Sequence, residues 1–162
     1  MWLKLNPKRM ALLMLQISTL NKSQKLNVKS QKLMKNRTLE WAEAKDVKKE
    51  LKKIIKALDF SHIKSSRVFC YRTEGSKAKA YARTWMMPKI FQDALGIEPA
   101  YVIEVLSKYY DRLNEDQKSE VLIHELLHIP KNFSGALLSH RGRTRHIGHD
   151  ANSLFKKYKN SK

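Results

Sequence analysis

A short helical stretch with two histidines four residues apart most constrains what this chain can fold into. Residues 121–128 read Val-Leu-Ile-His-Glu-Leu-Leu-His, which places His124 and His128 one helical turn apart. Both imidazoles then point to the same side of the helix and can bind one metal ion. Glu125 lies to one side of this pair, close enough to take a proton from a water that the metal activates. The stretch therefore predicts a metal centre on a helix.

Local signals define both ends of this helix. Asn114 is a suitable N-cap, and Gln117 follows three residues later, as in a capping box. Glu115 and Asp116 favour the positive end of the helix dipole, and Pro130 stops the helix. Leucine and isoleucine cover a wide apolar arc, so the helix is expected to be buried. Two imidazoles and a carboxylate on a buried helix need partners, either core hydrogen bonds or a shared metal ion.

The charge is unevenly distributed. The 162 residues suffice for one domain, and 33 Lys and Arg against 15 Asp and Glu give a net charge of +18. Residues 1–37 hold nine of the basic residues and no acidic one. We expect this segment to be a poorly ordered basic arm that precedes a domain over residues 38–162. The excess of positive charge favours anionic partners such as nucleic acid, or reflects only a lysine-rich, soluble surface.

Cysteine use and hydropathy exclude other classes of protein. Cys70 is the single cysteine, so an intramolecular disulfide and a cysteine-based metal cluster are excluded. Cys70 lies in an apolar run and is expected to be a small core residue. No apolar stretch reaches the roughly 18 residues that a membrane span requires. A reducing compartment fits this composition, and we expect the chain to be cytoplasmic.

The pattern of apolar residues predicts a mixed fold. Helical spacing predicts helices, and runs of β-branched and aromatic residues predict strands. The expected elements are a helix over 39–58, strands over 67–72 and 78–86, a helix over 88–95, a strand over 101–106, the motif helix, a loop over 131–142 and a helix over about 150–159. The first two strands are expected to pair as a hairpin. The fold class is α+β, with a sheet of three or more strands packed on the motif helix and flanked by N-terminal and C-terminal helices.

A catalytic zinc site usually has three protein ligands and keeps a fourth position open for water. The motif helix supplies two, so the third ligand must come from another segment. His140, His146 and His149 all follow within 21 residues of His128. The spacing alone leaves these three candidates open.

Several short sequences carry a family resemblance. They are Arg67-Val68-Phe69-Cys70, residues 75–83 (Gly-Ser-Lys-Ala-Lys-Ala-Tyr-Ala-Arg), Ala94-Leu95-Gly96, residues 101–105 (Tyr-Val-Ile-Glu-Val), and residues 121–130 with Phe133 and Gly135. From about Val68 to Tyr158 the chain thereby resembles metallopeptidases of archaea and phages, which are compact zincin-like domains. The motif helix is the most specific part of the likeness. The resemblance implies a zincin-like fold, a bound Zn²⁺ and a protein or peptide substrate.

The resemblance also bears on the third ligand. In the family a histidine follows the Phe-x-Gly loop at about the distance of His140, so the resemblance implies that His140 completes the metal site. The segment beyond this loop departs from the family pattern and is richer in histidine, which keeps His149 as an alternative. In zinc peptidases of this general build, an edge strand of the sheet pairs with the extended substrate. Either 78–86 or 101–106 is expected to be that edge.

Three functions fit these residues. The preferred one is a zinc-dependent peptidase that hydrolyses peptide bonds through a metal-activated water, with Glu125 as the general base. Arg141, Arg143 and Tyr101 are candidates to stabilise the oxyanion, by their chemistry alone. The alternative is a basic nucleic-acid-binding protein whose structural zinc is closed by four ligands and which has no catalysis. The third is metal-dependent hydrolysis of a bond other than a peptide bond, which would use the same residues.

Overall fold

The computed structural model describes residues 38–140 and 147–161. The arm predicted over residues 1–37 lies outside these described residues. In chain order the elements are strand β1 (Glu40–Glu43), helix α2 (Lys45–Ala57), a short 3-10 turn (Ser65–Arg67), strands β2 (Val68–Glu74) and β3 (Ala82–Met86), helix α3 (Lys89–Leu95), strand β4 (Tyr101–Leu106), and helices α4 (Ser107–Tyr110), α5 (Glu115–Leu127) and α6 (Ile147–Asn160). The α+β prediction is confirmed, with four strands in one mixed sheet.

The strands lie in the order β1-β2-β4-β3. The central pair, β2 and β4, is parallel, and each outer strand is antiparallel to its neighbour. Within the described sheet β3 therefore pairs on one side only, with β4. Of the two segments expected to pair with an extended substrate, 78–86 therefore contains an edge strand and 101–106 does not, while the pairing with a substrate stays a prediction.

The predicted hairpin between 67–72 and 78–86 is wrong, because β4 lies between β2 and β3. The physical reason is the composition of β4. Five of its six residues are buried, and all but Glu104 are aromatic, aliphatic or β-branched, a composition typical of a central strand. Strand β3 contains Arg83 and Thr84 and is only partly buried, so it takes the edge.

The predicted helix over 39–58 begins later than expected. Residues Glu40–Glu43 form β1, which pairs antiparallel with β2, and α2 starts only at Lys45. Between them Ala44 is buried, and its N–H donates to the carbonyl of Cys70 at 2.9 Å. Strand β2 thus gives the backbone groups of this segment hydrogen-bond partners, whereas in the first turn of a helix the N–H groups would bond only to water. For this reason the segment forms a strand although its apolar residues have helical spacing.

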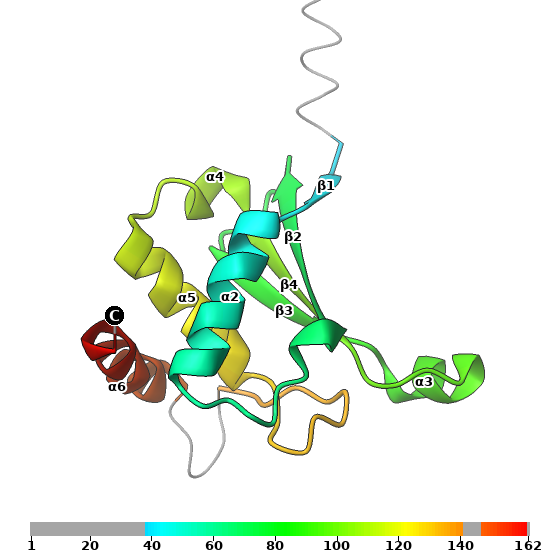
Figure 1. The fold of residues 1–162 in the computed structure, drawn as a ribbon. Coiled ribbons are helices and arrows are strands. Elements are labelled where there is room, and N and C mark those ends of the chain that lie inside the picture. Colours follow the sequence, from blue (N-terminus) through cyan, green and yellow to red (C-terminus); the bar gives the residue numbers. More distant parts are fainter. Residues whose placement is uncertain (1–37, 141–146, 162) are drawn as a thin grey trace, which may run out of the picture. The chain divides into compact units, whose positions relative to one another are not determined.

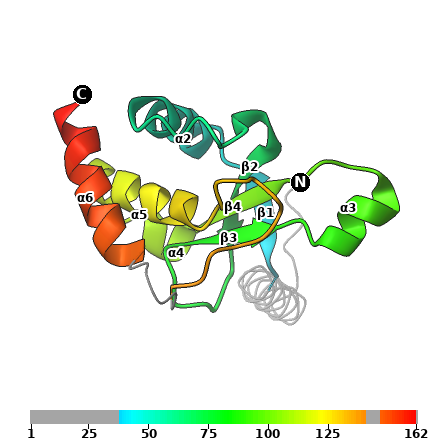
Figure 2. The same ribbon diagram turned by 90° about the horizontal axis from the view of Figure 1, so that it is seen from below.

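Helices α2 and α5 form the core with one face of the sheet (Figures 1 and 2). Helix α2 packs on β2, α5 packs on β3 and on α2, and α6 packs on α5. Strand β4 and α5 supply fully buried side chains such as Ile103, Leu122 and Ile123. Trp41, Phe69, Tyr71 and Trp85 are exposed at this sheet. Because α5 lies against β3, the motif histidines come to lie beside the edge strand.

Candidate metal centre

The motif helix is fixed at its N-terminus by the predicted capping box. The Asn114 side chain accepts a hydrogen bond from the Gln117 N–H at 2.8 Å, and the Gln117 side chain accepts from the Asn114 N–H at 3.1 Å. Two of the free N–H groups of the first turn are thereby satisfied. At the other end His128 is the C-cap of α5, so His124 and His128 both lie in its final turn.

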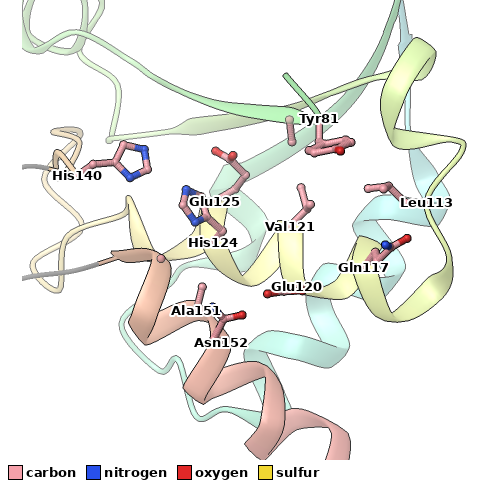
Figure 3. Close-up of a pocket in the computed structure, with 12 residues that line it drawn as sticks. Tyr81, Leu113, Gln117, Glu120, Val121, His124, Glu125, His140, Ala151 and Asn152 are labelled. Atoms are coloured by element: carbon pink, nitrogen blue, oxygen red, sulfur yellow. The ribbon is translucent and has the colours of Figure 1, made fainter. Parts of the chain in front are cut away.

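Three imidazoles converge beside this last turn. His124, His128 and His140 each offer a ring nitrogen, and these atoms all lie within 4.8 Å of one another. The ring centroids of His128 and His140 are 4.5 Å apart, and those of His124 and His140 are 4.9 Å apart. His140 reaches the cluster from the loop after α5, and Figure 3 shows its ring on the side of that loop that faces His124 and Glu125. The structure thus brings together the two motif histidines and the third ligand that the resemblance implies.

The loop that carries His140 is attached directly to His128. The Leu138 N–H donates to the His128 carbonyl at 2.8 Å, and Nδ1 of His128 lies 2.6 Å from the Leu138 carbonyl oxygen. A carbonyl only accepts hydrogen bonds, so Nδ1 donates in this contact and Nε2 is the ring nitrogen that faces a metal. A histidine whose second nitrogen donates to a carbonyl is the usual arrangement of a metal ligand. Leu138 therefore orients the His128 ring and also places His140, two residues later.

Tyr101 anchors the first half of the same loop from strand β4. Its hydroxyl accepts from the Gly135 N–H at 2.8 Å and donates to the Ala136 carbonyl at 3.0 Å. The ring packs edge-on against Phe133, with centroids 4.9 Å apart. Burial raises the pKa of Tyr101, which keeps the hydroxyl protonated and able to donate. Tyr101 is thus occupied in holding the loop.

A close approach of two segments explains the glycine in this loop. Gly135 has a φ of 81°, a conformation that favours glycine. A Cβ at this position would lie 2.0 Å from Nε2 of Gln92 and 3.2 Å from the Met87 carbonyl oxygen. The Gln92 side chain itself donates to that same carbonyl at 2.7 Å. The loop therefore rests on the start of α3, and only a residue without a side chain fits there.

The carboxylate of Glu125 is held by the edge strand. Glu125 is only 7% exposed, and Oε2 accepts from the Thr84 hydroxyl at 2.8 Å. The same hydroxyl lies 3.0 Å from the backbone carbonyl of Glu125. Thr84 is in the middle of β3, so its position fixes the carboxylate relative to the strand. Glu125 also lines the cavities on both sides of the histidine cluster.

Burial sets the protonation of the site. Desolvation, reinforced by the facing His128 and His140, lowers the pKa of His124 to about 4. The ring is therefore neutral at pH 7, which is the form that binds a metal. Desolvation also raises the pKa of Glu125, against the opposing effect of the Thr84 hydrogen bond. A carboxylate with a raised pKa is a stronger base than an exposed one.

The residues present fit a metal ion. Nitrogens that bind one tetrahedral zinc at about 2.0–2.1 Å lie about 3.3–3.4 Å apart. The three ring nitrogens lie within 4.8 Å of one another, so small rotations of the rings bring all three donors into bonding range. Neutral imidazoles suit zinc among the common divalent ions. Among the described residues the cluster has three members, which is the usual number of protein ligands in a catalytic zinc site.

Of the remaining candidates the structure describes His149 and Tyr101. The His149 side chain, on α6, is 85% exposed, and its Nδ1 is 3.8 Å from the Asp150 carboxylate. It is not a member of the histidine cluster. His146, Arg141 and Arg143 fall outside the described residues. Tyr101 does not act at the site as an oxyanion donor, because its hydroxyl is bonded within the loop.

Sequence reasoning missed two groups that shape the site and expected another role for a third. Thr84 holds Glu125 and the Leu138 carbonyl orients His128, whereas Tyr101, named as a candidate oxyanion donor, anchors the loop. These contacts span 10 to 41 residues of sequence. Such contacts carry no local pattern, so spacing has no means of showing them.

A comparison with known protein families agrees with this geometry. Residues 39–157 match the model of a family described as putative phage metallopeptidase. The chain belongs to this family. The match runs from the residue before β1 almost to the end of α6, and so includes the three histidines and Glu125. No curated protein and no solved structure matches the chain.

Membership assigns the chain to a class of hydrolases. A metallopeptidase uses a metal ion and acts on proteins or peptides, and the histidine cluster is a group that could hold such an ion. None of the described helices is long and apolar enough to cross a membrane.

Proposed function

We propose that the chain is a zincin-like, zinc-dependent peptidase in which His124, His128 and His140 hold the metal and Glu125 is the general base. The observation that carries the proposal is the convergence of three imidazoles on a buried carboxylate beside a sheet edge. Zinc is favoured because three neutral nitrogen donors with an open fourth position are the usual ligand set of catalytic zinc.

The chain's own residues divide the chemistry as follows. A bound zinc ion supplies Lewis acidity, which makes water more acidic and polarises a carbonyl. Glu125 accepts a proton from the attacking water and then gives it to the leaving amine nitrogen. Thr84 keeps the carboxylate of Glu125 in place, and the Leu138 carbonyl keeps the His128 ring in place. The low exposure of Glu125 strengthens these interactions by excluding water.

The edge strand supports a peptide as the substrate. Two cavities, of about 560 and 380 Å³, lie along β3, and both are lined by Ala82, Glu125 and His140. Because they share these residues, with His124 lining the larger cavity and His128 the smaller, we treat them as two halves of one groove at the histidine cluster. Within the described sheet the outer side of β3 has no partner strand. An extended peptide can add to such an edge through backbone hydrogen bonds, whereas a compact small molecule gains nothing from it.

No observation favours the nucleic-acid-binding alternative. A structural zinc needs four ligands, and His149 is exposed and outside the described cluster. Nucleic-acid binding by residues 1–37 stays a prediction, since that segment lies outside the described residues.

The test is the replacement Glu125→Gln. Glutamine has the same shape and still accepts from Thr84, so zinc should bind with unchanged stoichiometry, while cleavage of an unfolded protein such as casein should fall by roughly 10²- to 10⁴-fold. Glu115→Gln is the matched control, because Glu115 is on the same helix but 83% exposed and paired with Lys118. Zinc retention with wild-type cleavage by Glu125→Gln would eliminate Glu125 as the base.

A further inference from the structure

The larger half of the groove has the features of a specificity pocket. This cavity, of about 560 Å³, lies between α5, α6 and the residues at the start of β3 (Figure 3). Its inner end is formed by the histidine cluster and Glu125, so a substrate residue next to the cleaved bond would place its side chain there. Tyr81, Leu113 and Val121 supply apolar walls.

Helix α5 adds one further carboxylate to the lining of this cavity. Besides Glu125, the only acidic residue that lines the cavity among the described residues is Glu120, and no described lysine or arginine lines it. Glu120 precedes His124 by one helical turn, which is about 6 Å along the helix axis. Figure 3 shows Glu120 beside Asn152 where α5 faces α6.

The other acidic groups of α5 are already used. Glu115 pairs with Lys118 at 2.8 Å, and Asp116 pairs with Lys159 at 2.6 Å. Glu120 has no ion pair among the described residues. In a chain with 33 Lys and Arg, a half-buried carboxylate without such a partner in a substrate cavity points to a cation that comes with the ligand.

We propose that this cavity takes a lysine or arginine side chain of the substrate next to the cleaved bond, and that Glu120 binds its charged end. The inference rests on the peptidase function proposed above. The methylene stem of a lysine or arginine fits the apolar walls, since these side chains bury their stems and keep the charged head near polar groups. The Asn152 amide lies on the same lining, and its oxygen can accept from that head.

Small residues of α6 leave room for the side chain. Gly148 and Ala151 line the cavity, and a Cβ built on Gly148 has no atom within 4 Å. A larger residue at 148 would therefore fill the cavity without a backbone clash. The positive net charge of the chain does not prevent a lysine or arginine side chain from binding here. The repulsion from distant basic residues is screened beyond about 8 Å at physiological salt, whereas Glu120 acts in contact with the ligand.

The test uses peptides that differ only at the residues flanking the cleaved bond, with lysine, norleucine or glutamate at each position. Wild-type zinc protein should cleave a lysine peptide with a kcat/KM roughly three to ten times that of its norleucine counterpart. Glu120→Gln should remove most of this ratio, and Glu120→Lys should reverse it in favour of glutamate. Glu115→Gln, on the same helix and outside the groove, should leave the ratio as in the wild type.

Two further measurements separate binding from chemistry and from folding. In a Glu125→Gln background, the affinity for a fluorescent lysine peptide should fall by a similar factor when Glu120→Gln is added. Gly148→Leu should shift the preference from lysine and norleucine towards alanine, because leucine fills the cavity. Zinc content and thermal melting of each variant establish that it is folded.

The outcomes are distinguishable. If the zinc protein cleaves no peptide of the set and no unfolded protein, the proposed function fails. If it cleaves peptides but the charge ratio is near one, or is the same in Glu120→Lys, the peptidase stands and the role of Glu120 is wrong. An unchanged preference in Gly148→Leu would likewise show that the side chain binds outside this cavity.

Discussion

Removal of one oxygen from Tyr101 tests whether strand β4 positions the metal site. Tyr101→Phe keeps the ring, its burial and its contact with Phe133, but it deletes the group that accepts from the Gly135 N–H and donates to the Ala136 carbonyl. The buried N–H is left without a partner, at about 1–3 kcal/mol, and the loss of the second bond adds about 0.5–1.5 kcal/mol. We expect the free energy of unfolding of the metal-free protein to fall by about 2–4 kcal/mol.

The same substitution should also weaken metal binding. His140 follows Ala136 by four residues on the loop that Tyr101 anchors, so a looser loop should weaken zinc binding by about 10- to 100-fold, as removal of groups that orient ligands typically does. Urea unfolding measures the first effect, and competition with a chromophoric chelator measures the second. Tyr71→Phe is the control, since Tyr71 is exposed on strand β2 and should change stability by less than about 0.5 kcal/mol. If Tyr101→Phe behaves like Tyr71→Phe in both assays, Tyr101 does not position the site.

Three further predictions follow from the same contacts. His140→Ala should lower zinc affinity by about 100-fold or more, whereas His149→Ala should leave it unchanged in the same chelator competition; the reverse result would exchange their roles. Gly135→Ala should lower the free energy of unfolding in urea by about 2–4 kcal/mol, because the left-handed backbone disfavours a side chain and Gln92 must give up its hydrogen bond to Met87. Gly148→Ala, where a Cβ on α6 meets no atom, should be neutral or stabilising. Equal effects of the two substitutions would contradict this prediction. Burial raises the pKa of the Cys70 thiol to about 11, so a thiol reagent at pH 8 should label the native protein slowly. Labelling should become faster as the pH approaches 11, and it should be immediate in urea. Rapid labelling of the native protein at pH 8 would show that Cys70 is accessible.

Much of the motif helix was readable from the sequence because its interactions are local. The capping box joins residues three apart, and the two motif histidines meet because residues four apart share a helix face. The short helix that follows Pro88 also ends as predicted, at Gly96, whose φ of 59° is left-handed. Each of these features depends on neighbours within one helical turn, so the residue types alone specify it.

The partners of the strands were not readable in the same way. Composition correctly marked three strand segments, but the pairing of β2 with β4 instead of β3 joins residues about 33 apart. The composition of β4, apolar at every position but Glu104, was a usable signal for a central strand that the hairpin prediction overlooked. The first strand, β1, has no such signal, since its residues form a strand only when the edge of β2 is present to bind them.

By itself, therefore, the sequence determined the helix with its two imidazoles and neighbouring carboxylate. The tertiary structure decided that His140 meets them while His149 does not, that Thr84 of the edge strand holds Glu125, and that Tyr101 and Gln92 hold the loop. The physical reason is the range of the forces involved. The geometry of a helix repeats every turn, so the spacing of residues in the sequence determines which side chains meet on it. A site that a loop completes depends instead on packing contacts between distant segments, and their order in the chain does not determine how close they lie in space.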